Sequence, residues 1–307
     1  MLKFLSLSRA IGAEILGLDA RNPIGSVEAK MLRQALDKYQ LLIIRKQVGL
    51  SNDQHIAFVN VFGQVADEHL DGEHIAWVSN KKERKVAVVG EQKLRFHSDF
   101  TWTPWPLPYI SLFAQELVGE VAPTQFASAR RAWQALTPEL QEELAQWRGH
   151  HRSNFSENAE YGNAEYCRQK HAEDPEAILY PCTNHPVRFS HPRTEDPLLF
   201  VSEQMTTEIE KVSKREESSN VEEASTLQAC FAALYDPDFL YHHRWQEGDL
   251  IIWDNIALQH GRKAFAPLPG AAAPIRRLRR VVVSENYEDI LNFSPPLRAA
   301  MTKHSVS

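Results

Sequence analysis

The front of the chain has the apolar spacing of two helices around one strand. Residues 27–40 place apolar side chains three and four positions apart, which predicts an amphipathic helix. Residues 41–46 (LLIIRK) form a short apolar run that is typical of a buried strand. Ser51 is a suitable N-cap for a second helix, which we expect to end near Gly63.

The rest of the chain is dominated by strand-like runs joined by irregular loops. A helical pattern there covers residues 129–147, and Pro138 should divide it. Strands do not alternate with helices, so a parallel doubly wound sheet is disfavoured. The pattern predicts a mainly β fold with flanking helices and a jelly-roll core. The runs read as strands are residues 85–90, 108–117, 249–255 and 276–285.

We expect residues 1–307 to form a single domain. Its centre, around residues 150–200, is rich in His, Asn and Pro and shows no clear period. Long insertions of this kind in compact domains are often lids or binding loops, so we predict a lid there.

Composition and charge narrow the function. The 307 residues are 43% hydrophobic and 24% charged, with a formal net charge of −6, which favours neither nucleic acid nor an anionic membrane as a partner. No signal peptide or membrane-spanning run is evident, and the three cysteines lack CxxC spacing, so we expect a cytoplasmic protein. The cysteines are Cys167, Cys182 and Cys230.

The segment FHSDFTW carries two polar residues within an apolar and aromatic run. On a strand, His97 and Asp99 would share one face, as two ligands of one ion must. Alone, the pair is more simply a satisfied polar pair at a strand end. A third ligand would complete the two-histidine, one-carboxylate facial triad of non-haem iron, which leaves three positions open.

His260 is the best candidate for that third ligand. It follows the apolar segment DLIIWDNIALQ, so it should lie at a strand end that faces a barrel mouth. Six other histidines stand in polar or Pro-rich surroundings, and we predict that they lie on the surface or in loops. They are His150, His151, His185, His191, His242 and His243.

Four arginines enter the last apolar strand within the segment RRLRRVVV. Buried arginines are costly unless an anion meets them, and bidentate carboxylate recognition is the usual reason for them. If Arg276 faces the barrel interior, parity places Arg280 on the same face and points Arg277 and Arg279 outward.

These segments together carry a family resemblance. FHSDFTW, WDNIALQHGR and RRLRRV, in this order, resemble the taurine dioxygenase and chlorophenoxyacetate dioxygenase (TauD/TfdA-like) family. IGAEILGLDA, the segment from residue 41 to Gly63, and NHPVRFSHPRTEDPLLFVSE extend the resemblance over most of the chain. It implies a double-stranded β-helix core and an oxygenase that uses Fe(II), 2-oxoglutarate and O2.

The resemblance also implies roles for individual residues. Thr124 and Arg276 match the residues that hold the far carboxylate of 2-oxoglutarate, and Arg280 matches an arginine that meets an anionic substrate. In this chain Pro123 precedes the threonine, and the link to Arg276 is longer than in the taurine enzyme, so Arg276 and Arg277 could exchange roles. The implied metal ligands are His97, Asp99 and His260, and Trp253 and His69 match residues beside the substrate.

Several functions therefore remain open. The resemblance implies hydroxylation of a small, anionic organic substrate with release of succinate and CO2, or a biosynthetic desaturation or oxidative decarboxylation. Asp99 argues against halogenation. A metal-binding jelly-roll sensor and a zinc hydrolase are the alternatives from other classes. The anion facing Arg280 could be the substrate, the near carboxylate of 2-oxoglutarate, or an internal acid such as Glu91. Both a monomer and a homo-oligomer remain open.

Overall fold

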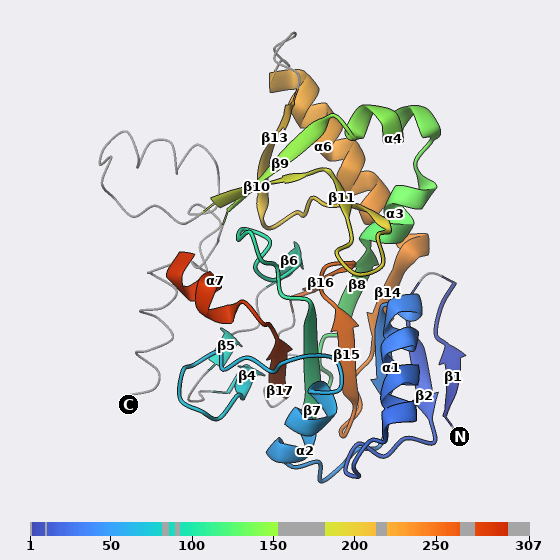
Figure 1. Ribbon diagram of the computed structural model, residues 1–307, viewed down its shortest axis with the longest axis vertical. Coiled ribbons are helices and arrows are strands. Elements are labelled where there is room, and N and C mark those ends of the chain that lie inside the picture. The colour runs from blue at the N-terminus through green and yellow to red at the C-terminus, as the bar shows by residue number, and fades with distance from the viewer. Residues whose placement is uncertain are drawn as a thin grey trace.

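Two facing β-sheets form the centre of the computed structural model, which describes residues 2–9, 11–81, 86–89, 93–152, 182–212, 220–264 and 274–293. The larger sheet has eight strands in the order β1-β2-β3-β15-β7-β17-β4-β5 (Figure 1). Most neighbours are antiparallel, whereas β2–β3 and β4–β5 pair in parallel. The strands are β1 (Lys3–Ser6), β2 (Ala13–Leu16), β3 (Leu41–Ile44), β15 (Leu250–Asp254), β7 (Tyr109–Val118), β17 (Ile275–Val283), β4 (Ala76–Ser79) and β5 (Val86–Val89).

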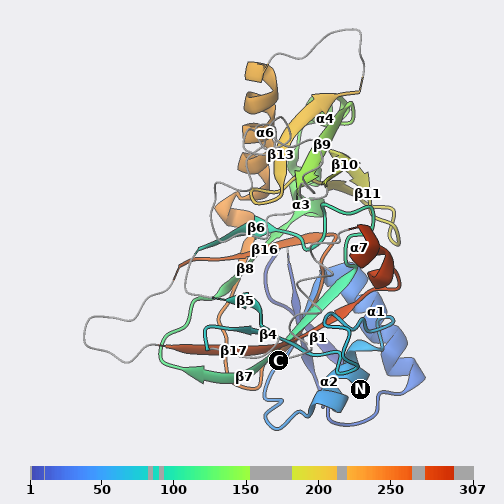
Figure 2. The ribbon, with the colours of Figure 1, turned by 90° about the vertical axis from the view of Figure 1, so that its left-hand side faces the viewer.

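The smaller sheet has four strands in the order β14-β8-β16-β6, and it lies over the inner face of the large sheet (Figure 2). Apolar side chains from both sheets meet between them; the rings of Phe126 and Trp253, for example, lie 5.5 Å apart at 68°. The strands are β14 (Leu240–His243), β8 (Thr124–Ser128), β16 (Leu258–Arg262) and β6 (Leu94–His97).

Two helices cover the outer face of the large sheet. They are α1 (Ser26–Tyr39) and α2 (Asn52–Val59), and Ser51 accepts from the backbone N–H of Gln54 as the predicted N-cap of α2. All four residues of β3 are buried because its alternate side chains enter two different cores. The helix–strand–helix order predicted from the apolar spacing is confirmed.

A third layer lies beyond the small sheet, at the top of Figure 1. The helix predicted over residues 129–147 is two helices, because Pro138 begins the second one behind the N-cap Thr137. No helix in the described part of the chain is long and apolar enough to cross a membrane. The layer contains α3 (Ala129–Ala135), α4 (Pro138–Leu144), α6 (Asn220–Leu234), β9 (Trp147–Arg152), β10 (Cys182–Pro186), β11 (Arg188–Ser190), β12 (Pro197–Leu199) and β13 (Thr206–Lys211); η2 (Pro237–Phe239) and α7 (Tyr287–Phe293) lie outside it.

The ends of the predicted lid are regular structure. β9 pairs with both β10 and β13, and β11 pairs with β12, so most of the described residues here, 147–152 and 182–199, are strand. Their period was obscured because short strands full of His, Asn and Pro lack the usual apolar alternation. Residues 153–181 lie outside the described residues, and a lid there remains a prediction.

The expectation that these six histidines lie on the surface or in loops was wrong for three of them, which are buried within strands, whereas His191 lies in a loop but is buried there. These strands and loops are covered by neighbouring layers, so imidazoles are buried although their sequence surroundings are polar. His150 is half-buried and His242 is exposed. The buried residues are His151, His185, His191 and His243.

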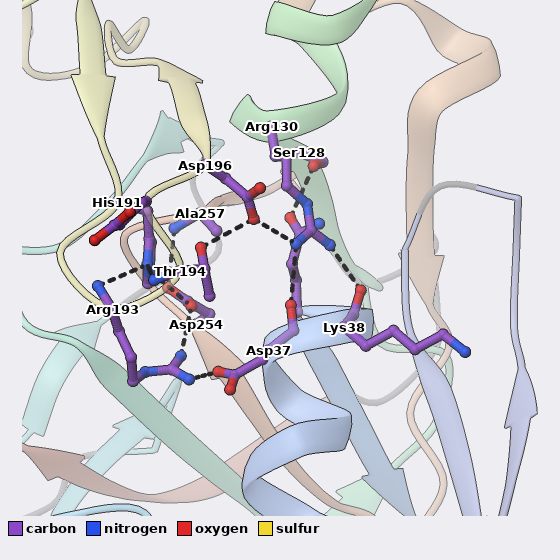
Figure 3. A network of polar contacts seen from close by, with 12 residues as sticks. Asp37, Lys38, Ser128, Arg130, His191, Arg193, Thr194, Asp196, Asp254 and Ala257 are labelled. Atoms are coloured by element: carbon purple, nitrogen blue, oxygen red, sulfur yellow. Dashed lines mark hydrogen bonds and ion pairs between the residues drawn. The ribbon is translucent and has the colours of Figure 1, made fainter.

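A polar network with the buried pair His191–Asp254 at its centre holds the β11–β12 connection against the large sheet (Figure 3). His191 Nδ1 accepts from the backbone N–H of Thr194 at 3.1 Å, so the ring proton of neutral His191 is on Nε2, which lies 3.0 Å from Asp254 Oδ2. The other carboxylate oxygen of Asp254 accepts two backbone N–H groups. Arg193 connects Asp254 to Asp37 near the end of α1.

A second buried network lies under α2. Arg279 Nε donates to His55 Nδ1 at 3.2 Å, His55 Nε2 lies 2.8 Å from Ser111 Oγ, and that hydroxyl donates to a backbone carbonyl of β15. Arg279 therefore points away from the barrel interior, as parity predicts, but it is only 2% exposed because α2 covers that face. The expectation of a simple outward-facing arginine is corrected by this helix.

We expect Asp254→Asn to destabilise the fold by about 3 kcal/mol, because either orientation of the amide would place its NH2 group against another donor. Denaturant unfolding measures the change. Asp19→Asn removes a carboxylate from a surface pair with Arg21 and should have little effect. Equal stability of the Asp254 and Asp19 variants would contradict this interpretation.

The buried His55 predicts a pH dependence of stability. Burial, and then the Arg279 cation, hold the pKa of His55 well below its ordinary value. The unfolded chain consequently binds the extra proton first, so stability is present above about pH 6.5 and is lost as the pH falls below it. Between about pH 7.5 and about pH 5.5, His55→Gln should lose about 1.4 kcal/mol less unfolding free energy than the wild type. Identical losses would show that His55 does not contribute.

Candidate metal centre

A turn, rather than a strand, brings Asp99 to the side of His97. β6 ends at His97, and Phe100 has a positive φ of 63°, so the chain reverses directly after the aspartate. The sequence prediction that both residues lie on one strand is therefore corrected. The i, i+2 spacing still gives convergence, because the turn folds the carboxylate back toward the strand end.

Asn255 holds this turn through three hydrogen bonds. Its Oδ1 accepts from the backbone N–H of Asp99 at 3.0 Å, and its Nδ2 donates to the carbonyls of Asp99 and Leu107 at 3.0 and 2.9 Å. Asn255 has no exposed surface. A buried amide with both ends bonded fixes the backbone of the turn, and with it the position of the carboxylate.

Strand pairing supplies the second histidine. His260 lies within β16, directly opposite His97 of β6, and the two ring centroids are 4.2 Å apart. Trp253 packs on the other side, with its ring 5.0 Å from that of His260. The structure thus places His260 inside the small sheet rather than at the strand end expected from the sequence.

The three side chains offer ligand atoms that all lie within 4.8 Å of one another. Asp99 Oδ1 is 3.2 Å from His97 Nε2 and 4.0 Å from His260 Nε2. Adjacent ligands of an ion with bonds of about 2 Å lie about 3 Å apart, so small side-chain movements would close a three-ligand site. Two imidazoles and one carboxylate fit an octahedral iron with open positions.

The surroundings prepare these groups for a metal. His97 Nδ1 lies 2.8 Å from the carbonyl oxygen of Arg95. Because a carbonyl oxygen can only accept, the proton of the neutral ring is on Nδ1, and the lone pair of Nε2 is available to a metal. Burial, followed by the nearby His97, lowers the pKa of His260 well below its ordinary value and keeps that ring neutral. Burial alone would raise the pKa of Asp99, but the Arg280 cation holds it well below its usual range.

A buried cation lies on the same inner face. Arg276 Nη2 donates to Thr124 Oγ1 at 2.9 Å, and Trp245 Nε1 donates to the same hydroxyl at 3.0 Å. Burial lowers the pKa of Arg276 to about 9, and no described residue places a carboxylate within ion-pair distance of it. Arg277 faces the other way, with its guanidinium 3.8 Å from the centre of the Trp77 ring.

Arg280 has the opposite environment. Its Nη1 donates to Asp99 Oδ2 at 2.7 Å, while Nε and Nη2 donate to the two oxygens of Glu68 at 2.9 and 3.1 Å. Internal acids therefore meet this arginine, and Glu91, the acid considered from the sequence, lies outside the described residues. His69, next to Glu68, is 2% exposed.

Three residues of this centre were not identified from the sequence as functional. Asn255 stood within the quoted motif WDN, and its position directly after a buried strand was an available signal. Trp245 and Glu68 gave no signal, because their partners lie 121 and 212 positions away. A separate hollow of about 290 Å³, beside Asp254 and Trp105, is lined by none of the three candidate ligands.

Known proteins share both this sequence pattern and this fold. Residues 3–282 match the family described as taurine catabolism dioxygenase TauD, TfdA family. The chain is 27% identical over 293 residues to pentalenolactone F synthase of Streptomyces avermitilis, and this match covers 90% of this chain and 91% of that protein. It is 27% identical over 273 residues to the alpha-ketoglutarate-dependent 2,4-dichlorophenoxyacetate dioxygenase of Cupriavidus pinatubonensis, covering 80% and 87% of the two chains.

A solved taurine dioxygenase from Burkholderia xenovorans superposes with a TM-score of 0.72 at 23% identity, covering 92% of this chain and 90% of that one. This likeness confirms the predicted jelly-roll fold with flanking helices. Members of the matched family act on small molecules and depend on Fe(II), 2-oxoglutarate and O2. The chain belongs to the taurine catabolism dioxygenase TauD, TfdA family and is a 2-oxoglutarate-dependent dioxygenase.

Proposed function

We propose that the His97, Asp99 and His260 side chains hold the iron of this dioxygenase. The convergence of their ligand atoms within 4.8 Å carries the proposal. Bound iron supplies the activation of O2, with oxidation of the substrate and conversion of 2-oxoglutarate to succinate and CO2. The protein's part is to hold the ligands on one side of the ion, so that cosubstrate and O2 share the other.

Arg276 and Thr124 are the proposed receptor for the far carboxylate of 2-oxoglutarate. A buried guanidinium without a described carboxylate partner has a large desolvation cost, which an incoming anion would offset. Thr124 and Trp245 fix the position of the Arg276 guanidinium without neutralising its charge. This geometry also favours Arg276 over Arg277, because Arg277 stacks on Trp77 on the other face.

The substrate is a small organic molecule placed near His69, Trp253 and Arg280, and hydroxylation is the proposed outcome. A biosynthetic oxidation is the second candidate, favoured by the similarity to pentalenolactone F synthase over 90% of this chain. The anionic group predicted on the substrate stays a prediction: the internal acids beside Arg280 remove the main argument for it. A sensor or a zinc hydrolase would give Arg276 no anion to bind.

We further propose a cytoplasmic enzyme, supported by the two cysteines among the described residues. Cys182 is exposed and Cys230 is buried, and both are free thiols. Burial raises the pKa of Cys230 to about 12, which makes that thiol unreactive. Cys167 lies outside the described residues.

His260→Ala should remove one of three ligands and lower Fe(II) affinity by about 100-fold or more, with loss of 2-oxoglutarate turnover. Anaerobic Fe(II) titration measures the affinity, and succinate formation measures the turnover. The exposed His242 provides the matched control, because His242→Ala removes an imidazole away from the centre. Full metal binding by the His260 variant would overturn the ligand assignment.

Arg276→Ala should raise the dissociation constant for 2-oxoglutarate by about 30-fold or more, because a buried charge-assisted pair typically contributes about 2–5 kcal/mol. Calorimetric titration of the metal-loaded protein measures this, and Fe(II) affinity should stay unchanged. Arg277→Ala, which removes a guanidinium that stacks on Trp77 on the other face, is the control. Loss of 2-oxoglutarate binding in the Arg277 variant alone would reverse the assignment.

A further inference from the structure

Glu68 is built into the metal centre by the chain that follows α2. The backbone N–H of Ala66 donates to the carbonyl of Val282 at 3.0 Å, so this segment runs beside the end of β17. The hydroxyl of Tyr287 donates to the backbone carbonyl of Glu68 at 3.3 Å. These contacts hold Glu68 over Arg280 through the backbone, independently of any substrate.

The Glu68 carboxylate uses both oxygens on one guanidinium. Its two bonds to Arg280, at 2.9 and 3.1 Å, form a bidentate pair, and the two residues are 7% and 5% exposed. Bidentate pairs are the strong form of this interaction, and in a site shielded from water they are hard to displace. Glu68 is therefore a buried counter-ion of Arg280, and the pair is not a surface salt bridge.

The pair changes what Arg280 offers to a ligand. Asp99 contacts Arg280 through Oδ2 and faces the two histidines through Oδ1. Glu68, in contrast, directs both of its carboxylate oxygens at Arg280. Together Glu68 and Arg280 carry no net charge. An anionic group arriving at Arg280 would meet the buried Glu68 carboxylate at close range, and like charges in a desolvated site repel strongly.

Arg280 can still donate to an uncharged acceptor. A guanidinium has five N–H groups. Three of them donate to Glu68 and Asp99. The remaining two suit a carbonyl, hydroxyl or ether oxygen, which accepts hydrogen bonds without bringing a charge beside Glu68. Arg276, with no described carboxylate, keeps its charge for an anion.

We propose that Glu68 is a specificity-determining residue, which makes the site at Arg280 select an uncharged oxygen-bearing group of the substrate and reject an anionic one. This inference rests on the proposed function, because it concerns the substrate side of the same centre. It replaces the anionic recognition expected from Arg280 alone. Neutralising Glu68 should restore that recognition.

The test uses acetate as a small anionic probe and acetamide as its uncharged counterpart. Each is titrated by calorimetry, without O2, into the protein loaded with Fe(II) and 2-oxoglutarate. The wild type should bind acetate no better than acetamide, whereas Glu68→Gln should bind acetate at least about tenfold more tightly than the wild type does. Glu247→Gln, an equal charge change at an exposed site, should behave as the wild type.

The double variant Glu68→Gln, Arg280→Gln tests whether the tighter binding of acetate depends on Arg280. In the double variant, acetate affinity should return to the wild-type level, and acetate binding that stays tight would overturn the proposal. Tighter binding of acetate than of acetamide by the wild type would also overturn it. If Glu68→Gln does not fold, this wild-type comparison decides. The visible absorption band of the iron–2-oxoglutarate complex is recorded separately, and its absence would refute the proposed function. The acetate titration tests only the proposed role of Glu68.

Discussion

The buried amide of Asn255 is the contact on which the candidate metal centre depends. It follows the last residue of β15 in the large sheet and precedes β16 of the small sheet, and it bonds both ways to the backbone of Asp99. One side chain therefore sets the position of the ligand turn relative to both sheets. His97 and His260 need no such device, because direct strand pairing already places them opposite each other.

Rigid placement matters because the three candidate ligands are brought together at an electrostatic cost. Asp99 and His260 are taken out of water, and burial opposes the charge of the carboxylate. Arg280 compensates that cost by donating to the carboxylate oxygen that faces away from the histidines. The same arginine then needs a second acid, and Glu68 provides it. The Glu68 contact is thus a consequence of how the proposed metal ligand Asp99 is stabilised.

Much of this architecture could be predicted from local pattern. Apolar spacing located the first helix, Pro138 divided the helix after β8, and the order of the motifs identified the family and the three candidate ligands. Errors arose where distant contacts decide the environment. Parity gave the direction of Arg279 correctly, but not the helix that buries it, and the Glu68–Arg280 pair spans 212 positions. Local sequence has no period that reports such a pairing.

β17 shows how one short segment meets three different electrostatic demands. Among the described residues, Arg276 has only neutral partners. Arg279 donates to an imidazole, to the side-chain oxygen of Asn52 and to a backbone oxygen, and Arg280 has two carboxylates. The pKa directions follow these partners: burial lowers that of Arg276 to about 9 and that of Arg279 to about 10, whereas the acids raise that of Arg280. The cation least compensated by the fold is the one that gains most from an incoming anion. In the proposed function, ligand selectivity along this wall follows from which arginine the protein neutralises, and the spacing of the arginines alone does not encode it.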